Sequence, residues 1–522
     1  MSNQKQSKYI LAIDHGTSGA KTAIVSVYGK IIDFVFEQTP LYLKEKGGAE
    51  QDPDEWWQAI LSSSKTLIDR DLVPVEDIEA ICCSSQWSGT VAVDSEGNHL
   101  MNAIIWMDSR GAPIINKLMS GFLNVSGYSI FKIPRWLWKT GGAPTLGGKD
   151  PIAHILYLKH ELPDIYNNTY KFLECKDFLN LKFTGKFAAS FDSITLHWVT
   201  NTRNIHNVHY DKALIKKLKI DGKKLPELKQ AIDILGDVSK KVADEIGISR
   251  KVKVVTGSPD VPSAVIGSGA VKDFQGHIYV GTSSWISTIV PYKKTDISHN
   301  MASLPSPIPG KYFLANEQES AGACLSYLHD NIFRDEQPEI YQKFDEIAEK
   351  VPAGSDKVIF TPWLYGERTP IEDHTVRGGF YNLSLTSKKE NLIRAVFEGV
   401  AYNSRWLLKY IEAFIKRKME ALNIIGGGAN SDIWCQIYAD VLNRTIRRVQ
   451  NPIQANAKGA AFIASVALGH ITFDDIPNLI QFERVFHPNP EHTKIYDQLF
   501  KEYLLIYKNN KAMYKRLNTH RS

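Results

Sequence analysis

The chain has 522 residues, of which 43% are hydrophobic and 23% charged, which excludes an intrinsically disordered protein and is too long for a single hydrophobic core. Its formal net charge is +5, and the last twenty residues alone carry five basic side chains and no acidic one. Because a nucleic-acid surface needs a basic face across a whole domain, we expect a solvated helix end there and no nucleic-acid partner.

The beginning of the chain alternates strands and helices. The predicted elements are a strand at Tyr9–Ile13, a hairpin meander through Thr22–Val27 and Ile31–Phe36, a helix that begins at Asp54 with Trp56, Trp57, Ile60 and Leu67 on its apolar face, and a strand at Ile78–Ser84. This alternation is typical of the α/β class.

The middle of the chain repeats that order. The predicted elements are a strand at Lys253–Thr256, a helix at Ala264–Ala270, and strands at Ile278–Val280 and Trp285–Val290. Each half thus contains a strand, a turn with Gly and Thr, and a second strand, which favours a duplicated fold. We divide the chain into an N-terminal domain, residues 1–255, and a C-terminal domain, residues 256–522. The Lys-rich segment Thr202–Gly247 should form peripheral helices and loops.

The C-terminal part contains longer helices. We predict a helix at Asn391–Ile415, a strand at Ala421–Ile425, a helix that begins near Ser431, and a final helix after Pro490. The apolar stripe of the final helix indicates core packing.

Two features bear on the compartment of the protein. The five cysteines are odd in number and lack metal-ligand spacing, so we expect them to be reduced and the protein to be cytoplasmic. The longest apolar stretch, Ala460–Leu468, is far shorter than the ~20 residues of a membrane span, so we expect no membrane partner.

The segment after the first strand has the residue types of a phosphate cradle. Gly16 lets backbone N–H groups approach phosphate oxygens, Thr17 and Ser18 add hydroxyl donors, and Lys21 adds a cation. Asp14, at the strand end, could hold Mg²⁺ through water. An ordinary Gly-rich turn is the alternative. The sequence has no Walker A motif, which disfavours a P-loop kinase.

Two further Gly-containing turns strengthen this interpretation. Gly281 and Thr282 form a second cradle of the same type, and two such hairpins could clamp a polyphosphate from opposite sides. Gly427 lies within a run of three glycines that permits backbone approach to a flat ring. Ser431 after it could bond an adenine edge or a ribose, or it could simply cap the helix.

Asp260 is the candidate general base. It follows Gly-Ser-Pro at a strand end, so it should project from a tight turn and could accept a proton from an attacking hydroxyl. The alternative is that Asp260 caps the following helix.

Polar groups beside indole rings mark a candidate acceptor site. Gln86, Trp87 and Ser88 follow one strand, and Asp108 and Arg110 follow Trp106 at another. Sugars pack their C–H faces on aromatic rings, although two core tryptophans and a surface Asp108–Arg110 ion pair would explain the same pattern.

In this order, the segments resemble the FGGY carbohydrate kinases of the actin-like ATPase superfamily. The resemblance rests on DxGTxxxK at Asp14, GTSSW at Gly281, GGGAxS at Gly426 and the stretch TPWLYGERTP from Thr361 to Pro370, and it extends from about Tyr9 to His470. It implies two actin-like (ribonuclease H-like) domains that flank a cleft and close on substrate. It also implies ATP as the phosphate donor, Mg²⁺ near Asp14 and Asp260, and Asp260 as the base.

The resemblance also assigns individual positions. Phosphate-contacting positions are Gly16, Thr17, Ser18, Lys21, Gly281 and Thr282; nucleotide-contacting positions are Gly322, Gly427 and Ser431; and Gln86, Trp87 and Ser88 fall where the family binds its acceptor. The family often forms homodimers.

The acceptor itself is open, because Trp87-Ser88 replaces the Met-His of many xylulose kinases and the Arg-Glu of glycerol kinases. We predict a ketopentose, D-xylulose first, with glycerol, gluconate and other polyols as alternatives. A non-catalytic actin-fold nucleotide switch is the rival from another class. A dinucleotide-binding oxidoreductase would need GxGxxG after the first strand, where Asp-His-Gly-Thr stands instead.

Overall fold

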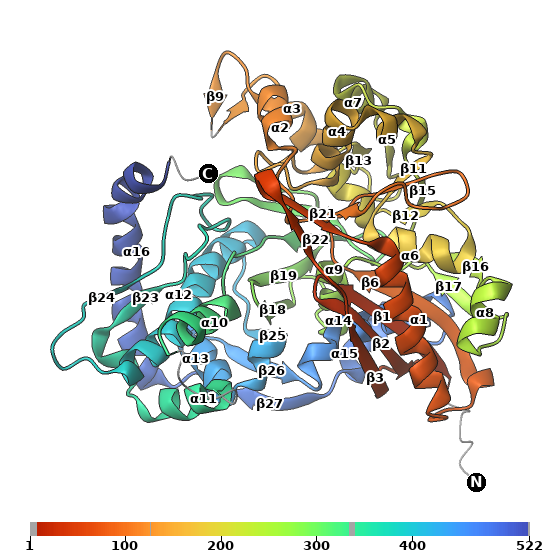
Figure 1. Ribbon diagram of the computed structural model, residues 1–522. Helices are drawn as coiled ribbons and strands as arrows, with labels where there is room; N and C mark the ends of the chain where they lie inside the picture. Colours follow the sequence, from red (N-terminus) through yellow and green to blue (C-terminus); the bar gives the residue numbers. More distant parts are fainter. Residues whose placement is uncertain (1–7, 126, 334–339, 520–522) are drawn as a thin grey trace, which may run out of the picture.

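Two twisted β-sheets, one in each half of the chain, form the centre of the molecule, with helices packed against them (Figure 1). The computed structural model describes residues 8–125, 127–333 and 340–519. The α/β class predicted from the sequence is therefore confirmed.

The N-terminal sheet has six strands. Their spatial order is β16 (Ile234–Asp237), β17 (Lys253–Val255), β6 (Ile78–Ser85), β1 (Tyr9–Gly16), β2 (Gly19–Ser26) and β3 (Ile31–Gln38). The β17–β6 and β6–β1 pairs are parallel, and the pairs on both outer sides are antiparallel.

The C-terminal sheet has eight strands. Their spatial order is β20 (Thr295–Asp296), β21 (Met301–Pro305), β22 (Tyr312–Ala315), β19 (Ser284–Val290), β18 (Gly276–Val280), β25 (Ala421–Ile425), β26 (Thr445–Val449) and β27 (Phe482–Phe486). Its β18–β25 and β25–β26 pairs are parallel, and β18–β19, β19–β22 and β26–β27 are antiparallel. The two sheets thus share one pattern of strand directions, and the duplication predicted from the turns is present in the topology.

The remaining elements cover and connect these sheets. The helices are α1 (Pro53–Asp69), α2 (Ala112–Met119), α3 (Ile133–Thr140), α4 (Pro151–Glu161), α5 (Pro163–Asn168), α6 (Cys175–Thr184), α7 (Lys212–Leu218), α8 (Lys240–Ile246), α9 (Asp260–Gly267), α10 (Gly322–Asn331), α11 (Ile340–Lys350), α12 (Lys389–Ile415), α13 (Asp432–Leu442), α14 (Ala455–Ala467), α15 (Ile476–Leu479) and α16 (Pro490–Asn518). Short strands pair as β4 (Tyr42–Lys44), β5 (Gly48–Gln51) and β8 (Ala103–Ile104); β7 (Val91–Val93) with β11 (Lys171–Leu173); β9 (Asn124–Val125) with β10 (Tyr128–Ser129); β12 (Ala188–Ser190) with β15 (Glu227–Lys229); β13 (Thr200–Asn201) with β14 (His209–Tyr210); and β23 (Ile359–Thr361) with β24 (Gly379–Tyr381).

Local sequence signals account for several boundaries. The carboxylate of Asp52 accepts a 2.9 Å hydrogen bond from the backbone N–H of Asp54, and Pro53 occupies the first turn of α1, where its missing N–H costs nothing. The long helix predicted from Asn391 begins at Lys389 and ends at Ile415 as expected. The final helix begins at Pro490, capped by the side chain of Asn489.

Two boundaries differ from the sequence prediction. The helix expected to begin at Ala264 begins at Asp260: β17 ends at Val255, four residues follow, and Pro259 stands directly before the first helical residue. The segment 202–247 is not wholly peripheral, since β16 within it forms the edge strand of the N-terminal sheet.

The C-terminal half meets the N-terminal sheet through α14, which also packs closely against α9. A Cβ added to Gly267 of α9 would lie 1.8 Å from the carbonyl oxygen of Ala455, and one added to Gly459 of α14 would lie 2.0 Å from that of Ser263. Only glycine permits this approach of the two helices. Helix α14, although late in the sequence, also packs on β1 and β6 of the N-terminal sheet.

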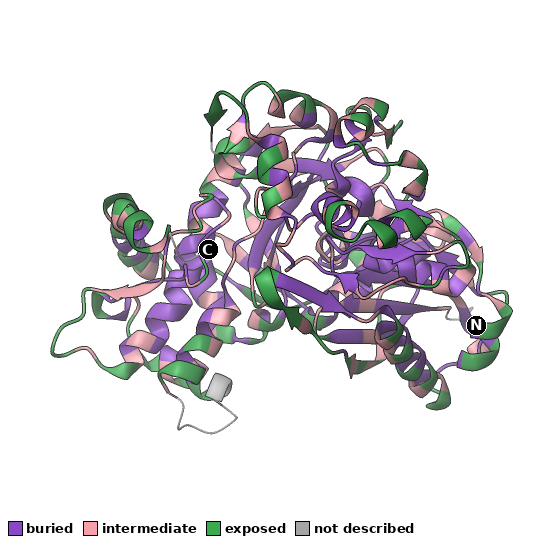
Figure 2. Cartoon of the chain, turned by 45° about the horizontal axis from the view of Figure 1, so that its top comes forward, coloured by how far each residue is buried: buried purple, intermediate pink, exposed green. Residues whose placement is uncertain are grey.

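Burial follows this architecture (Figure 2). One hydrophobic cluster surrounds α12, α13 and α16, a second lies between the N-terminal sheet and α1, and a third includes α9, α14 and residues of both sheets. Each large apolar side chain so buried stabilises the fold by about 1.5–3 kcal/mol relative to exposure. The third cluster belongs to both halves and fixes their relative position.

All five cysteines are buried and free, as the reduced state predicted for them requires. Among the described residues, no helix is both long and apolar enough to span a membrane.

Candidate active site

The two Gly-Thr segments form the turns of two equivalent hairpins. In the N-terminal half Gly16 pairs with Gly19, so Thr17 and Ser18 make the turn between β1 and β2. In the C-terminal half Val280 pairs with Ser284, and Gly281–Ser283 make the turn between β18 and β19. Ser18 and Thr282, at the tips of these turns, are exposed. Both turns therefore present hydroxyl and backbone N–H groups to a ligand.

Asp14 lies at the base of the first hairpin and contacts the other half of the chain. Its Oδ1 accepts a long hydrogen bond, 3.4 Å, from Nδ2 of Asn456 on α14, and its Oδ2 lies 3.8 Å from Nζ of Lys21. Lys21 also donates a 3.0 Å hydrogen bond to the carbonyl oxygen of Ile453. Burial raises the pKa of Asp14, although Lys21 and Asn456 favour its charged form. Both side chains thus lie between the two domains.

Gly322 supports the second hairpin. Its backbone N–H donates a 2.8 Å hydrogen bond to the carbonyl oxygen of Gly281, and a Cβ at this position would lie 2.7 Å from the same oxygen. Ala321 and Ala323 donate backbone hydrogen bonds to the carbonyl oxygen of Thr282. The start of α10 is therefore fixed against the turn by contacts that a larger residue at 322 would displace.

The three glycines before α13 have different surroundings. A Cβ on Gly426 would lie 2.5 Å from the carbonyl oxygen of Val280, whereas a Cβ on Gly427 would meet no atom within 4 Å. Ser431 accepts a hydrogen bond from the backbone N–H of Trp434, so it caps α13, and it donates a 2.7 Å hydrogen bond to Asp345. Gly427 is thus exposed to open space beside β18, while the Ser431 hydroxyl already has two partners.

Asp260 is the first residue of α9. Its Oδ1 accepts a 2.8 Å hydrogen bond from the backbone N–H of Val261, and no side chain in the described part of the chain donates to it. Burial raises the pKa of Asp260 to about 8, and the negative charges of Asp14 and Glu317 add to the rise. Its carboxylate does not cap α9 through Ser263, because the backbone N–H of Ser263 donates instead to the carbonyl oxygen of Pro259 at 3.0 Å.

A buried polar cluster that the sequence analysis missed supports the Asp260 strand end. Nζ of Lys176 and Nδ2 of Asn180, both on α6, donate hydrogen bonds of 3.0 and 2.7 Å to the carbonyl oxygen of Thr256. Lys176 is fully buried and forms an ion pair with Asp177, its neighbour in the chain. The signal in the sequence is a Lys-Asp pair directly before the apolar residues Phe178 and Leu179.

The same cluster reaches the candidate acceptor site. Ser258 donates a hydrogen bond to the buried carboxylate of Asp192, and Ser193 donates one of 2.8 Å to Asp177. The indole N–H of Trp87 donates a 3.0 Å hydrogen bond to the carbonyl oxygen of Ser193. The strand end before Asp260 and the Trp87 ring are therefore held by one continuous network.

Gln86 connects the first hairpin with the acceptor strand. Its Oε1 accepts a 3.0 Å hydrogen bond from the Thr17 hydroxyl, and its Nε2 donates a 2.7 Å bond to Gln51. Gln51 donates in turn to the carbonyl oxygen of Thr17, and Trp106 donates its indole N–H to the Thr17 hydroxyl at 2.9 Å. Gln86 is buried, and both the oxygen and the nitrogen of its amide are hydrogen-bonded. Gln51 is a second residue of this network that the sequence analysis missed.

Ser88 has an unusual backbone conformation. Its φ of 68° lies in the left-handed region, which costs free energy for a residue with a Cβ. Its hydroxyl donates a 2.7 Å hydrogen bond to the carbonyl oxygen of Lys149. The Lys149 side chain lies near Tyr365, with Nζ 5.6 Å from the ring centroid. Such strain in an ordered segment is common at functional sites.

Asp108 and Arg110 form a buried ion pair rather than a surface one. Oδ2 of Asp108 lies 2.7 Å from Nη2 of Arg110 and also accepts a 2.9 Å hydrogen bond from the backbone N–H of Ala49. Arg110 contacts Glu50 at 2.7 Å and lies over the ring of Tyr157. These contacts join three chain segments, and their role toward an acceptor stays a prediction.

The C-terminal domain contributes a cluster of charged side chains from the TPWLYGERTP stretch and the residues that it contacts. The guanidinium of Arg368 lies 2.5 Å from Oε2 of Glu317 and 2.6 Å from Oε1 of Glu319. Oε1 of Glu367 accepts the backbone N–H groups of Glu319 and Arg368, and burial raises the pKa of Glu367 to about 7. Burial and the Arg368 charge lower the pKa of Lys149, which belongs to the opposite domain.

This arrangement has the chemistry of phosphoryl transfer between two domains. Two hairpin turns expose hydroxyl groups of the kind that donate to phosphate oxygens, and the carboxylates of Asp14 and Asp260 are oxygen groups of the kind that Mg²⁺ prefers. Neither carboxylate is fully buried, and the Asp14 charge acts on Asp260, so the residues present fit a divalent cation. A duplicated α/β fold with an equivalent Gly-Thr hairpin in each half is the architecture of the actin-like fold.

Comparison with known proteins identifies the family. Residues 9–267 match the N-terminal domain and residues 276–468 the C-terminal domain of the FGGY family of carbohydrate kinases. The chain is 29% identical over 510 residues to a xylulose kinase from Staphylococcus epidermidis, which covers 97% of each chain. Its fold is similar to a gluconate kinase from Lactobacillus acidophilus (TM-score 0.87, 27% identity) and to a xylulose kinase from that organism (TM-score 0.86, 28% identity), over 98% of this chain and 100% of theirs in both cases.

The chain belongs to the FGGY family of carbohydrate kinases. It is accordingly a phosphotransferase with an alcohol group as acceptor, and ATP is the implied phosphate donor. The family resemblance inferred from the sequence motifs is confirmed.

Proposed function

We propose that this protein transfers the γ-phosphate of ATP to a hydroxyl group of a ketopentose, D-xylulose first, with Asp260 as the general base. The observation that carries the proposal is the environment of Asp260. A carboxyl group with a pKa of about 8 begins α9 close enough to Asp14 to feel its charge, and the fraction of it that is ionised near neutral pH can accept a proton.

In the proposed reaction the acceptor hydroxyl oxygen attacks the γ-phosphorus, the bond from that phosphorus to the bridging oxygen of ADP breaks, and the hydroxyl proton moves to Asp260. Gly16, Thr17, Ser18 and Lys21 on one side and Gly281 and Thr282 on the other would bind the phosphates. Asp14, with Asp260, would hold Mg²⁺, which supplies positive charge against the phosphate oxygens. In such reactions most of the catalysis is positioning and electrostatics.

Gly322, Gly427 and Ser431 complete the proposed nucleotide site. The open space above Gly427 supports this assignment most directly, because a flat ring can approach the backbone there without displacing an atom. The Ser431 hydroxyl is a weaker candidate, since the cap of α13 and Asp345 already use it.

The proposed acceptor site consists of Gln86, Trp87 and Ser88, with Asp108 and Arg110 behind them. The similarity to xylulose kinases supports a ketopentose. Trp87, half-buried and fixed through its indole N–H, offers a ring to the C–H face of a sugar. Gln86 would act by holding the hairpin and the acceptor strand together, since both ends of its amide are engaged.

A second candidate acceptor is an aldonate such as gluconate, and one residue favours it. Lys149 lies next to Ser88, and among the described residues Glu319 and Glu317 act on its ammonium group only from beyond ion-pair distance. An acceptor with a carboxylate would supply that partner, whereas a neutral ketose would not. The fold similarity to a gluconate kinase agrees with this alternative.

The test of the proposed function is ADP release with Mg-ATP against a panel of sugars, polyols and aldonates. For Asp260→Ala we expect kcat to fall by roughly 10²–10⁴ while nucleotide affinity stays near wild type. Acceptor-independent, slow ADP release would instead indicate the nucleotide switch. Retained phosphorylation of the true acceptor by Asp260→Ala would refute the base assignment.

The two acceptor classes are separated by Lys149→Met. If the acceptor is an aldonate, its KM should rise at least tenfold with Lys149→Met and recover with Lys149→Arg, as expected for a lost charge-assisted contact. If D-xylulose is the acceptor, both variants should keep a KM near that of the wild type.

A further inference from the structure

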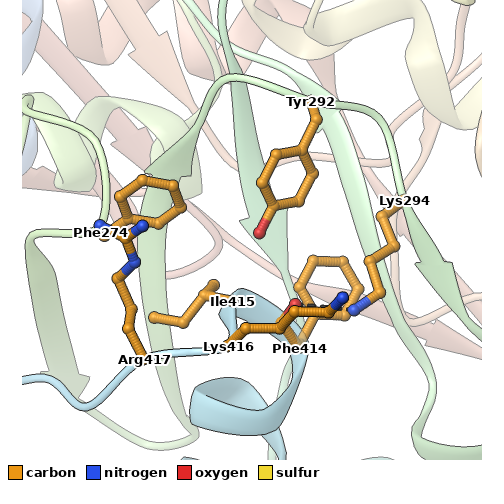
Figure 3. Close-up of a pocket in the computed structure, with 7 residues that line it drawn as sticks. All are labelled: Phe274, Tyr292, Lys294, Phe414, Ile415, Lys416 and Arg417. Atoms are coloured by element: carbon orange, nitrogen blue, oxygen red, sulfur yellow. Dashed lines mark hydrogen bonds between the residues drawn. The ribbon is translucent and has the colours of Figure 1, made fainter.

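A pocket of about 400 Å³ lies in the C-terminal domain at the end of α12 (Figure 3). Its apolar part comes from the rings of Phe274, Tyr292 and Phe414. The Tyr292 hydroxyl points toward the space between Phe274 and Phe414. This volume is within the range of small-molecule sites in proteins.

The pocket is remote from the phosphate hairpins. Phe274 precedes β18 and Tyr292 follows β19, whereas the turn Gly281–Ser283 joins the other ends of these two strands. The length of β19 separates the pocket from that turn by roughly 20 Å. A ligand here is therefore distinct from ATP and from the acceptor.

Three cations line this pocket and no acid does. They are Lys294 from the segment after β19, and Lys416 and Arg417 from the residues that follow α12. The Arg417 guanidinium lies 3.8 Å from the centroid of the Phe274 ring, and Nζ of Lys294 lies 4.3 Å from that of Phe414. Figure 3 shows these two cation–ring pairs on opposite sides of the pocket. The rings hold the cations in place without neutralising them.

Three acidic side chains close to the pocket residues in the sequence are paired with other cations. Glu412 of α12 forms hydrogen bonds of 2.7 to 3.1 Å with the guanidinium of Arg444. Asp273 contacts Lys311 through both carboxylate oxygens at 2.9 Å, and Asp296 contacts His299. Within the described residues, Lys416 and Arg417 have no carboxylate partner. The pocket lining therefore has three positive charges and no negative one.

The helix dipole explains only part of this charge. Cations are favourable at a helix C-terminus, which accounts for Lys416 and Arg417 directly after α12. It does not account for Lys294, which comes from a different element and donates a 2.7 Å hydrogen bond to the carbonyl oxygen of Phe414. Nor does a dipole require an open cavity. Cations that converge on a cavity from two elements have the chemistry of an anion site.

We propose that this pocket binds a small anion with at least two negative charges, of the class of phosphorylated metabolites. Arg417 offers a planar fork for phosphate oxygens, and Lys294 and Lys416 offer point charges around them. The hydroxyl of Tyr292 supplies one neutral donor. The aromatic walls accommodate the carbon skeleton to which the phosphate is attached.

The experiment is a calorimetric titration of inorganic pyrophosphate into the full-length enzyme. Saturating Mg-ADP keeps the nucleotide cleft occupied, and the free Mg²⁺ concentration is held constant. We expect one saturable site per chain in the wild type. The double variant Lys294→Gln/Arg417→Gln should bind pyrophosphate roughly tenfold or more weakly, and Arg417→Lys should bind with an affinity between those of the wild type and the double variant. Basal ADP release should be unchanged in these variants, which shows that they fold.

The matched control is Arg250→Gln, which removes an exposed arginine that pairs with Asp244 in the N-terminal domain. It should leave pyrophosphate binding unchanged. Equal binding by the wild type and the double variant would overturn the proposal, as would an equal loss in Arg250→Gln, because binding would then follow overall charge and not this pocket.

Discussion

The hydroxyl of Thr17 donates a 3.0 Å hydrogen bond to Oε1 of Gln86, which ties the turn of the first hairpin to the strand end that carries Trp87 and Ser88. The backbone adds a second connection, since the N–H of Gln86 donates a 2.7 Å hydrogen bond to the carbonyl oxygen of His15. The proposed sites for phosphate and acceptor are thus one hydrogen-bonded unit.

Replacing Gln86 by Met should therefore impair both sites at once. The side chain keeps its size but loses its bonds to Thr17 and Gln51, which leaves buried polar groups unpaired at a cost of about 1–3 kcal/mol of unfolding free energy. We expect KM to rise for ATP and for the acceptor together, measured by initial rates, and the urea midpoint to fall. The control is Gln436→Met, which also removes two hydrogen bonds, to Asp440 and His487, but lies far along the chain in α13. Unchanged KM values in Gln86→Met would contradict the coupling.

The pH dependence of kcat/KM should report Asp260. A general base acts as the carboxylate, and burial together with Asp14 and Glu317 raises its pKa to about 8. Activity should therefore increase as the pH rises toward about 8 and then level. Glu317→Gln removes one of the negative neighbours and should move this limb to lower pH. If the rise of kcat/KM with pH keeps its midpoint in Glu317→Gln, or is still present in Asp260→Asn, the titrating group is not Asp260.

The same carboxyl should affect stability without any substrate. Its folded pKa of about 8 lies above its value in the unfolded chain, so its contribution is fully present at acidic pH and is lost as the pH rises to about 8. Asp260→Asn stays neutral throughout. The melting temperature of this variant relative to the wild type should therefore increase from pH 5 to pH 8 and change little above that, as scanning calorimetry can measure. A difference that is constant with pH would mean that the pKa is not raised.

The glycines of the proposed nucleotide site allow a test of which positions meet the ligand. Gly427→Ala adds a methyl group that touches no protein atom, so stability should stay within about 1 kcal/mol of the wild type. If the nucleotide lies over this residue, its KM should rise severalfold. Gly322→Ala, by contrast, places a Cβ 2.7 Å from the Gly281 oxygen and should cost about 1–3 kcal/mol in unfolding free energy. Gly427→Ala with an unaltered KM for ATP would remove this glycine from the site.

Local signals in the sequence were sufficient for the hairpins and for α1, because Gly-Thr turns, a capping Asp52 and a periodic apolar face specify those elements within a few residues. They were insufficient for the support of Asp260. Lys176 reaches Thr256 across 80 positions, and no local pattern encodes such a contact. The same reason explains β16, whose place in the sheet is set by pairing with β17.

Other expectations concern properties that the fold alone does not determine. The division at residue 255, the cytoplasmic location and a homodimer stay predictions, as do the individual site residues. The pair Asp108–Arg110 shows why the sequence does not decide such roles, because the same two residues suit an acceptor site or a structural ion pair. Their contacts with Ala49 and Glu50 are those of a structural ion pair.

The last prediction concerns the anchoring of α16, which packs against α13 and β23. Oε1 of the buried Glu398 accepts hydrogen bonds from Arg394 at 2.7 Å, from the Tyr496 hydroxyl at 2.8 Å and from the backbone of Gly354 at 2.9 Å. Glu398→Gln keeps the shape but leaves the Arg394 charge without its counterion in the core, which should cost about 3–5 kcal/mol in urea unfolding. The double variant Arg394→Met/Glu398→Leu should recover much of this loss, because it removes both charges. KM for ATP should be unaffected in either variant that folds, since neither residue contacts a hairpin. If the double variant were as unstable as Glu398→Gln, the loss would come from the hydrogen bonds to Tyr496 and Gly354 and not from the unpaired charge.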